Sequence, residues 1–320
     1  MHRAAFNPDA EADMYTDAAF VERRRRALYD LLGELPPRDR AVTGRTLHVD
    51  DRDGYLVERL ELDLNGIEPV PAVLVKPAGP INEALPVVIY HHAHWNDYET
   101  GKEEALRGRA AMQKPPYGPA LADTGRAVLV IDHWCFGERR GNGESALFKQ
   151  MLWQGQVLWG AMVYDGLKAV DYACQRPDLD ASRIAVMGMS MGATMSWWTA
   201  ALDRRIKVCV DLCCMTDFDE LIADDGVDRH GIYYYVPNLL SEFTTAHINA
   251  LIAPRPHLTL VGTRDPLTPP RGVDKVDAAM TAVHTAHDSP PAWQLRRYDV
   301  GHEETPAMRH AVLRFLDEWL

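Results

Sequence analysis

Cysteine is scarce in this sequence and shows no functional spacing. Five cysteines occur among 320 residues, no two of them are arranged as CxxC, and three fall within residues 209–214, an apolar segment. An odd number of cysteines without such spacing does not indicate a disulfide framework or a zinc site. Cysteine in an apolar segment behaves as a small hydrophobic residue. We therefore expect reduced thiols and a cytoplasmic protein.

Long hydrophobic runs are also missing. No stretch approaches the roughly 18–20 apolar residues that a membrane-spanning helix needs. Residues 1–13 carry acidic side chains where a secretory signal would have an apolar run. The sequence therefore predicts neither a membrane span nor a secretion signal.

Positive charge is in short supply. The chain has 34 Lys and Arg residues against 46 Asp and Glu residues, which gives a formal net charge of −12. An acidic surface repels nucleic-acid phosphates and anionic lipid headgroups, so we expect no nucleic acid and no membrane as partners. We interpret the basic run at residues 23–26 as a solvated helix face. A small-molecule substrate is the expected partner, and a homo-oligomer stays open.

Apolar residues, in contrast, are plentiful at 47% of the chain. This is the composition of an ordinary soluble globular protein with one large core. The length would permit two domains, but α/β folds often reach this size as one unit. We therefore predict a single domain over residues 1–320, with an N-terminal helical extension over residues 1–40.

Short apolar segments alternate with helical segments through most of the chain. Continuous apolar runs predict strands that are covered on both faces, and residues 55–64 and 70–75 predict an antiparallel hairpin around Asn65-Gly66. This alternation predicts an α/β fold, with a mostly parallel sheet and helices on both of its faces. The strands are expected at 87–91, 127–132, 183–188, 207–213, 257–262 and 293–298, and the helices at 17–33, 164–174, 192–202, 273–284 and 305–320.

Residues 215–250 interrupt this alternation. The segment is rich in aspartate and aromatic residues and lies between two predicted core strands. We interpret it as a small lid-like insertion over the edge where the strands end. An ordinary surface loop with its own helix is an equally weighted alternative.

The segment Gly188-Met-Ser190-Met-Gly192 follows a predicted strand and precedes a predicted helix. In this setting a G-x-S-x-G sequence forms a strained strand-to-helix turn that exposes the serine hydroxyl. Side chains at positions 188 and 192 would collide with neighbouring backbone. The turn also places the Met191 N–H at a helix N-terminus, where it can stabilise an oxyanion. The five residues alone are weak evidence, but their setting favours Ser190 as a nucleophile over an idle serine.

Two later strands end in side chains that could activate this serine. A serine hydroxyl needs a base, and that base needs a third group to orient it. Asp265 and His302 each follow a predicted strand, in the chain order serine, acid, histidine. We therefore predict a catalytic triad of Ser190, Asp265 and His302. Asp217 and Asp219, after an earlier strand, are the alternative acids.

The first parallel strand leads into a loop that is rich in histidine. We expect the His94 amide to donate the second oxyanion hydrogen bond, with the Trp95 amide as the alternative. His91, His92 and His94 could also suggest a metal site, since two ligands that alternate along a strand have metal-type spacing. No cysteine or acidic residue at suitable spacing accompanies them, so we predict no metal.

Aromatic and charged residues near these strand ends are candidates for a substrate pocket. We expect Trp95, Trp134 and Tyr234 to line it and Arg139 or Glu138 to anchor a polar group, with loop packing as the alternative. Other residues of the same types are assigned elsewhere: Trp153, Trp159, Trp197 and Trp198 to the core, His310 to the surface, and His284 and His287 to capping or solvated positions.

Several motifs stand in order along the chain. They are His92-x-His94, Gly101-Lys102-Glu103, Asp132 with Gly137-Glu138-Arg139, Gly188-x-Ser190-x-Gly192, Leu251-Ile-Ala-Pro-Arg-Pro256, Asp265 and His302. With these motifs, the chain resembles the branch of the α/β-hydrolase superfamily that contains dienelactone-hydrolase-like and acetylxylan-esterase-like proteins, near the prolyl-oligopeptidase catalytic domains. The resemblance covers residues 69–320. It implies an α/β-hydrolase fold and carboxylic-ester hydrolysis without a cofactor. Two departures are Ser190, where dienelactone hydrolases use cysteine, and Ala93, where glycine is usual in the oxyanion loop.

The expected function is therefore that of a serine hydrolase acting on a small or medium carboxylic ester, with acetyl esters and lactones among the candidates. A peptidase or amidase of the prolyl-oligopeptidase type is one alternative, although such enzymes usually carry a propeller domain for which the N-terminal region is too short. An acyl-transferring enzyme on the same fold is another. A non-enzymatic binding protein would normally lack a triad member, and none is missing here.

Overall fold

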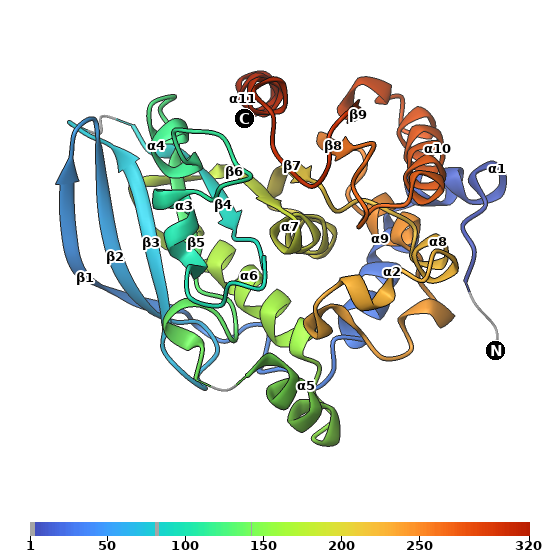
Figure 1. Ribbon diagram of the computed structural model, residues 1–320, viewed down its shortest axis with the longest axis horizontal. Coiled ribbons are helices and arrows are strands. Elements are labelled where there is room, and N and C mark those ends of the chain that lie inside the picture. The colour runs from blue at the N-terminus through green and yellow to red at the C-terminus, as the bar shows by residue number, and fades with distance from the viewer. Residues whose placement is uncertain (1–3, 81–82, 142) are drawn as a thin grey trace.

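The computed structural model describes residues 4–80, 83–141 and 143–320, and a single nine-stranded sheet runs through this part of the chain (Figure 1). The strands are β1 (Thr43–Arg52), β2 (Tyr55–Asp63), β3 (Val70–Pro77), β4 (Leu85–His91), β5 (Ala127–Ile131), β6 (Leu179–Met189), β7 (Ile206–Leu212), β8 (His257–Gly262) and β9 (Trp293–Tyr298). Their order is β1-β2-β3-β5-β4-β6-β7-β8-β9. The pairs from β1 to β3 and the pair β3–β5 are antiparallel, and the remaining pairs are parallel. The predicted mostly parallel sheet is confirmed.

Helices connect most of the strands. The longer ones are α2 (Ala18–Asp30), α5 (Glu144–Trp153), α6 (Leu158–Gln175), α7 (Met191–Leu202), α10 (Pro270–Ala286) and α11 (Pro306–Trp319). The short ones are α1 (Pro8–Glu11), α3 (Glu104–Arg107), α4 (Tyr117–Ala122), α8 (Phe218–Ala223) and α9 (Thr245–Ala250), and 3₁₀ turns occur at η1 (Ala12–Thr16), η2 (Gly101–Glu103), η3 (Gly137–Arg139), η4 (Val227–Arg229), η5 (Ile232–Tyr234), η6 (Leu239–Ser241) and η7 (Pro290–Ala292). Within the described residues, no helix combines the length and the apolar character needed to cross a bilayer.

Two different sets of helices pack against the two faces of the sheet. In β4, Val87 and Ile89 belong to one apolar cluster, whereas Val88 and Tyr90 belong to the other. The first cluster includes side chains of α2, α6, α7 and α10, and the second includes side chains of α4 and α11. Since alternate side chains of a strand face opposite sides, the sheet lies between two helical layers. Figure 1 shows α7 at the centre of the molecule.

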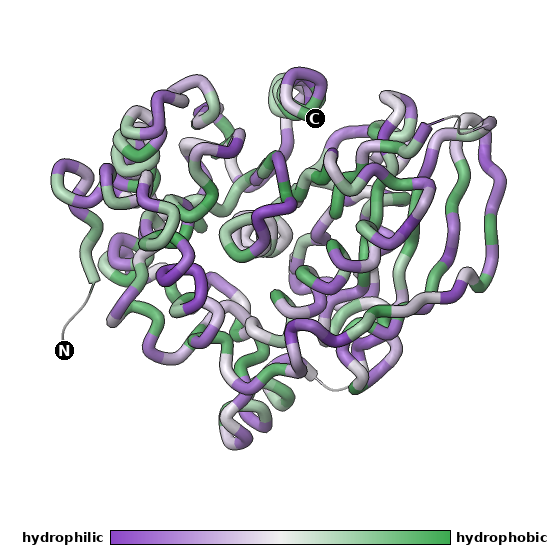
Figure 2. The backbone as a smooth tube through the Cα atoms, turned by 180° about the vertical axis from the view of Figure 1, so that it is seen from behind, coloured by the Kyte–Doolittle hydropathy of each residue, from purple (hydrophilic) through white to green (hydrophobic). Residues whose placement is uncertain are grey.

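The predicted hairpin is confirmed as β2 and β3, and its turn follows the expected chemistry. The side-chain oxygen of Asn65 accepts hydrogen bonds from the backbone N–H groups of Ile67 (2.8 Å) and Glu68 (3.1 Å), and Gly66 has a φ of 71°. An outer strand, β1, extends this hairpin and is not predicted. Its residues are largely polar and exposed, and Figure 2 shows hydrophilic and hydrophobic segments mixed along this edge of the sheet. An edge strand of this kind lacks the apolar pattern that identifies the buried ones.

The six strands and the five helices that the sequence predicts are all present. Their bounds move by a few residues, with α6 beginning at Leu158 rather than Tyr164 and β6 at Leu179 rather than Arg183. In the described part of the chain, six helices are additional, namely α1, α3, α4, α5, α8 and α9. The longest of them, α5, has 10 residues, so their helical periodicity is too short to detect.

Two aromatic side chains lie where the sequence analysis does not expect them. Trp153, assigned to the core, is 93% exposed at the end of α5, whereas the other three tryptophans of that set are buried as predicted. His284, assigned to a capping or solvated position, is buried on α10 with its ring 6.3 Å from that of Trp293. His310 is exposed and His287 caps the end of α10, as predicted. The two errors share one cause, because each depends on which face of a helix meets the core.

The basic run at residues 23–26 lies on α2 and is only partly solvated. Arg25 is buried, and its guanidinium donates hydrogen bonds to the backbone carbonyls of Ala201 (2.8 Å) and Leu251 (3.3 Å). This arginine therefore joins α2 to the end of α7 and to the segment before β8. The expectation of a wholly solvated face is wrong at this residue.

Residues 215–250 connect β7 to β8 and contain α8, α9 and three 3₁₀ turns. Tyr233 and Tyr234 are buried, and the ring of Tyr233 lies 5.5 Å from that of Trp159 in α6. The segment thus packs onto the first helical layer through aromatic contacts. Its role as a lid stays a prediction.

Candidate active site

Ser190 occupies a strained turn between β6 and α7. Its φ of 58° and ψ of −120° are unusual for a residue with a side chain. A Cβ atom on Gly188 would lie 2.4 Å from the carbonyl oxygen of His91, and one on Gly192 would lie 1.9 Å from the same oxygen. Glycine is therefore required at both positions, because the turn packs directly against the end of β4.

Backbone hydrogen bonds beyond the strands join the carboxyl ends of β6 to β9. The Ser190 N–H donates to the carbonyl of Leu212 at the end of β7 (2.9 Å), and the Cys213 N–H donates to the carbonyl of Leu260 in β8 (2.8 Å). After β8, the chain bonds in turn to the segment that follows β9. Residues that follow different strands are thereby held along one edge of the sheet.

Asp265 and His302 meet at this edge. The Nδ1 atom of His302 lies 2.6 Å from Oδ2 of Asp265, and the other carboxylate oxygen accepts a hydrogen bond from the Leu267 N–H (2.9 Å). The Asp265 side chain is 0% exposed and that of His302 is 15% exposed. A carboxylate can only accept, so the shared proton is assigned to Nδ1, which leaves Nε2 free to accept another. This is the arrangement that a general base requires.

The alternative acid, Asp217, has a different task. Its Oδ1 accepts a hydrogen bond from the Glu220 N–H (3.3 Å) as the N-cap of α8, and it lies 3.7 Å from the Lys275 ammonium. Asp219 is a residue of α8 itself. Of the acids considered in the sequence, the structure thus brings Asp265 to His302.

The two expected oxyanion donors are backbone amides at the ends of β6 and β4. The Met191 N–H is the first of α7, where the helix macrodipole is positive. The His94 N–H belongs to the loop after β4. Neither amide donates to an acceptor among the described residues. Both are therefore available to an oxyanion.

The loop after β4 adopts its shape without a glycine at position 93. The Ala93 N–H donates to both carboxylate oxygens of buried Glu104 (3.1 Å each), and the Ala93 carbonyl accepts from Arg109 (3.2 Å). Positive φ angles occur instead at Trp95 (53°) and Asn96 (52°). The loop after β4 therefore accommodates alanine at position 93, because its left-handed residues are Trp95 and Asn96.

The ring of His94 fixes the same loop from the other side. Its Nδ1 accepts the Asn96 N–H (2.9 Å), its Nε2 lies 3.2 Å from Oε1 of Glu144, and it stacks on Tyr233 at 5.2 Å. Tyr98 donates its hydroxyl to the same carboxylate (2.9 Å). Glu144 begins α5, which the sequence does not predict, so no local signal identifies it.

His91, His92 and His133 form a buried group behind this loop. Nδ1 of His91 lies 3.3 Å from Nε2 of His133, and Nε2 of His92 accepts the His133 N–H (3.2 Å). Burial lowers the pKa of His91 to about 3 and that of His92 to about 4, so these rings are neutral near pH 7. The ring of His94 has other partners. The candidate metal set of the sequence analysis, His91, His92 and His94, therefore does not converge on one point.

The Arg139 side chain is buried in an ion-pair network, which differs from its predicted role as an anchor for a polar group of the substrate. Its side chain is only 2% exposed and forms ion pairs with Glu68 (2.7 Å) and with Asp165 of α6 (2.8 Å). The guanidinium also lies 4.4 Å from the ring centre of Trp134, which is buried in the same packing. A buried carboxylate needs such a partner, so Arg139 is held by Asp165 rather than free for a substrate. The side chains of Arg139 and Trp134 are thus packed in the way that the loop-packing alternative describes.

One aromatic candidate contacts the Asp265–His302 pair directly, and a second contacts His230. The ring of Trp95 is 5.2 Å from that of His302. Tyr234 stacks on His230 at 5.1 Å. Burial lowers the pKa of His230, and the charges of His302 and Asp265 also act on it. The segment 215–250 thus contributes His230, a residue that the sequence does not single out, to the surroundings of the pair.

The strand order, the strained serine turn and the Asp–His pair at the carboxyl edge define the α/β-hydrolase fold. The model of the prolyl oligopeptidase family matches residues 139–320, more than half of the chain, and this range contains Ser190, Asp265 and His302. The chain belongs to the prolyl oligopeptidase family. The resemblance to this part of the superfamily is therefore confirmed.

Known proteins are similar to this chain over nearly its whole length. A Bacillus subtilis (strain 168) protein named "Putative hydrolase YtaP" is 48% identical over 93% of this chain and 99% of its own length. The structure of an acetyl xylan esterase from Paenibacillus sp. R4 has a TM-score of 0.64 at 20% identity and covers 100% of this chain and 98% of its own. A glucuronoyl esterase from Solibacter usitatus has a TM-score of 0.71 at 14% identity, over 94% and 93%. At such low identities the two structures share the fold with this chain.

Proposed function

We propose that this protein is a serine hydrolase that cleaves carboxylic esters through Ser190, His302 and Asp265. The observation that carries the proposal is the 2.6 Å contact between Nδ1 of His302 and the buried Asp265 carboxylate, at the sheet edge where Ser190 holds its strained turn. A histidine oriented in this way is the base that a serine nucleophile needs. The expected partner is a small-molecule ester.

The reaction proceeds in two halves. His302 Nε2 takes the hydroxyl proton as Ser190 Oγ attacks the ester carbonyl, and the amides of Met191 and His94 bind the resulting oxyanion. The intermediate collapses, the leaving alcohol takes the proton from His302, and an acyl-enzyme remains. Water, deprotonated by the same histidine, then attacks the acyl group; the bond to Ser190 Oγ breaks, the carboxylic acid leaves, and His302 returns its proton to Oγ.

Names of relatives support an ester as the substrate class. The Paenibacillus and Solibacter proteins are named as esterases, and the Bacillus relative is named as a hydrolase. Trp95 and Tyr234 remain our candidates for the pocket walls, since one contacts His302 and the other stacks on His230.

A reduced, cytoplasmic setting is part of the proposal, because all five cysteines are free and four are buried.

The test is a panel of p-nitrophenyl esters of increasing acyl length, combined with labelling by a fluorophosphonate probe. The wild-type chain should turn over at least one ester and take up one probe per molecule. Ser190→Ala should lose about 10⁴-fold or more in kcat and all labelling. Ser182→Ala, an exposed serine in β6, is the matched control and should behave as wild type.

A proline-containing peptide anilide in the same panel addresses the peptidase alternative. Ester turnover should exceed anilide turnover in kcat/KM. The proposal fails if Ser190→Ala keeps its activity and labelling, or if the anilide is the better substrate.

A further inference from the structure

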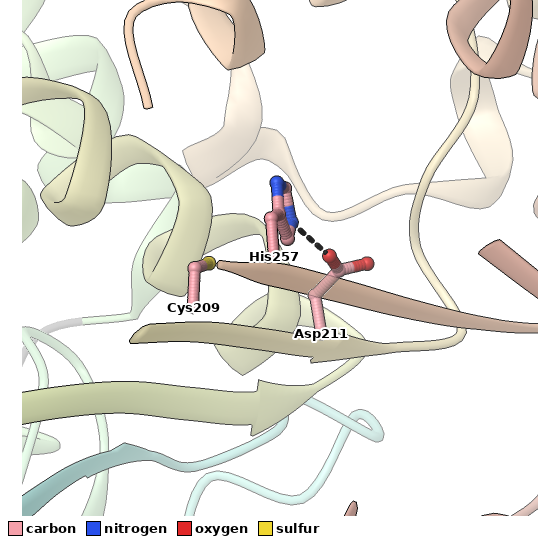
Figure 3. A group of neighbouring side chains, drawn as sticks. All are labelled: Cys209, Asp211 and His257. Atoms are coloured by element: carbon pink, nitrogen blue, oxygen red, sulfur yellow. Dashed lines mark hydrogen bonds and ion pairs between the residues drawn. The ribbon is translucent and has the colours of Figure 1, made fainter. Parts of the chain in front are cut away.

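Within the described residues, two groups bring a cysteine, an aspartate and a histidine together, with potential ligand atoms no more than 4.8 Å apart. One consists of Cys209, Asp211 and His257, on the neighbouring strands β7 and β8 (Figure 3). The other consists of Cys213 and the Asp265–His302 pair. Sulfur, imidazole and carboxylate are the donors that Zn²⁺ and related cations prefer.

The group in Figure 3 is closed to solvent. All three of its side chains are buried, and Asp211 Oδ2 is satisfied by His257 Nε2 (2.6 Å) and by the Thr259 hydroxyl (2.7 Å). None of these three side chains is accessible to solvent, from which a hydrated cation would arrive. We interpret this group as a buried structural hydrogen-bond network.

The second group differs in one ligand, because Cys213 and Asp265 are also buried but the ring of His302 is accessible to solvent. His302 is 15% exposed and lies at the edge of the sheet, where substrates must arrive. Cys213 directly follows β7, has a φ of 58°, and its Sγ lies 3.7 Å from the Glu303 carbonyl beside His302. The thiol, the carboxylate and the imidazole therefore come from three separate strand ends and meet beside one solvent-accessible ring.

We propose that Cys213, Asp265 and His302 form an inhibitory binding site for a soft or borderline divalent cation such as Zn²⁺ or Cd²⁺. Tetrahedral Zn²⁺ with bonds of about 2.0–2.3 Å separates its ligand atoms by roughly 3.4–3.7 Å. The site therefore forms if His302 Nδ1 moves roughly 1 Å away from Asp265. Water completes the coordination at the open side.

Binding changes which imidazole nitrogen carries the proton. The cation takes the Nδ1 lone pair, the ring proton moves from Nδ1 to Nε2, and the Cys213 thiol releases its proton to solvent. The ring stays neutral, but Nε2 becomes a donor and can no longer accept the Ser190 proton. One cation therefore binds, one proton leaves, and the base is switched off.

Cation binding itself can be measured without any substrate. Cd²⁺ bound to a thiolate produces an ultraviolet charge-transfer band, so titration of the intact chain with Cd²⁺ should yield a band that saturates at one Cd²⁺ per molecule. Cys213→Ser should lose this band. Cys214→Ser is the matched control, because its neighbouring buried thiol contacts the Thr194 hydroxyl instead and should leave the band intact.

Inhibition rests on the proposed ester hydrolysis and is tested separately. Zn²⁺ should inhibit the wild-type chain and the Cys214→Ser variant, with recovery on addition of EDTA. The Zn²⁺ concentration for half-inhibition, relative to the metal-free rate of the same variant, should rise at least tenfold in Cys213→Ser. Cys213→Ala, checked for folding by circular dichroism, serves as a second variant if the serine variant is unstable.

The outcomes separate the two proposals. A charge-transfer band that survives in both Cys213 variants overturns the proposed cation site. Equal inhibition by Zn²⁺ of the wild-type chain and the Cys213 variants also overturns it. A band that depends on Cys213, in a chain that hydrolyses no ester, supports the cation site and contradicts the proposed function.

Discussion

At the residue scale, the backbone of Ser190 is held in a conformation that residues with a side chain rarely adopt. Such a positive φ costs on the order of 1–3 kcal/mol and persists only where the surroundings enforce it. Here its N–H donates to Leu212 (2.9 Å) and its carbonyl accepts from Thr194 in α7 (3.1 Å). Gly188 and Gly192 have no side chains, so the end of β4 packs directly against the turn. The strain is thus enforced by β4, β7 and α7 together.

Gly192→Ala should destabilise the chain by about 1–3 kcal/mol or more, because its new Cβ meets two backbone carbonyl oxygens that cannot turn aside. Thermal unfolding followed by circular dichroism measures this as a lower Tm. Gly141→Ala is the matched control, since a Cβ there meets nothing within 4 Å. Equal Tm values for the two variants would contradict the close approach of β4.

The two candidate acids can be separated by a pair of amide substitutions. Asp265→Asn should lower kcat for an ester by about 10⁴-fold, because the histidine then loses the partner that sets its tautomer. Asp217→Asn should change kcat by no more than a few-fold, since asparagine also caps a helix. Steady-state kinetics on both variants decides the matter. A comparable loss in Asp217→Asn would point to the wrong acid.

At the scale of elements, the loop after β4 is held from two sides by carboxylates. Glu104 accepts the Ala93 N–H, and Glu144 from α5 receives the ring of His94. Both carboxylates come from helices that follow the loop in the chain. The position of the expected second oxyanion donor therefore depends on how α3 and α5 pack.

Glu144→Ala should lower kcat by about 10-fold to 100-fold, since outright loss of an oxyanion donor costs about 10²–10³. KM should change much less, because the donor acts mainly in the transition state. Glu144→Gln keeps an acceptor for the His94 ring and should recover part of the loss. Glu99→Ala, in the same loop but paired only at the surface with Arg140, is the control. A Glu99 variant that is equally impaired would show that the loop responds to any change.

Elements with a strong local pattern could be predicted from the sequence, and others could not. The strands β4 to β8 are mostly apolar, and Ser190 lies in a motif whose flanking strand and helix are visible in the neighbouring sequence. In contrast, β1 is a polar edge strand, and Glu144 and His230 reach the site only through tertiary packing. The sequence also does not show that Arg139 pairs with Asp165, because this partner belongs to a helix that is distant in the chain.

At the scale of the whole molecule, three buried neutral histidines lie at the ends of two neighbouring strands in the middle of the sheet. His91 ends β4, His92 follows it, and His133 follows β5, and all three are fully buried. Burial lowers the pKa of each, to about 3 for His91 and about 4 for His92, and well below its usual range for His133. The folded chain can bind their protons only at strongly acidic pH.

The lowered pKa values of these histidines make the folded state sensitive to acid. In the unfolded chain each histidine binds a proton near pH 6.5, so below that pH the unfolded state holds more protons than the folded one. The contribution of these neutral histidines to the free energy of unfolding is fully present above pH 6.5 and is lost as the pH falls toward 3–4. Each histidine contributes a slope of about 1.4 kcal/mol per pH unit within that window.

The free energy of unfolding, measured by urea denaturation at pH 7.5, 6.0 and 5.0, should therefore fall steeply below pH 6.5. His91→Gln removes one titrating ring, so its slope should be shallower by about 1.4 kcal/mol per pH unit, even if its stability at pH 7.5 is lower. His310→Gln, at an exposed position on α11, should keep the wild-type slope. If the His91 variant also keeps it, the acid sensitivity resides in the carboxylate ion pairs, and the buried histidines do not set it.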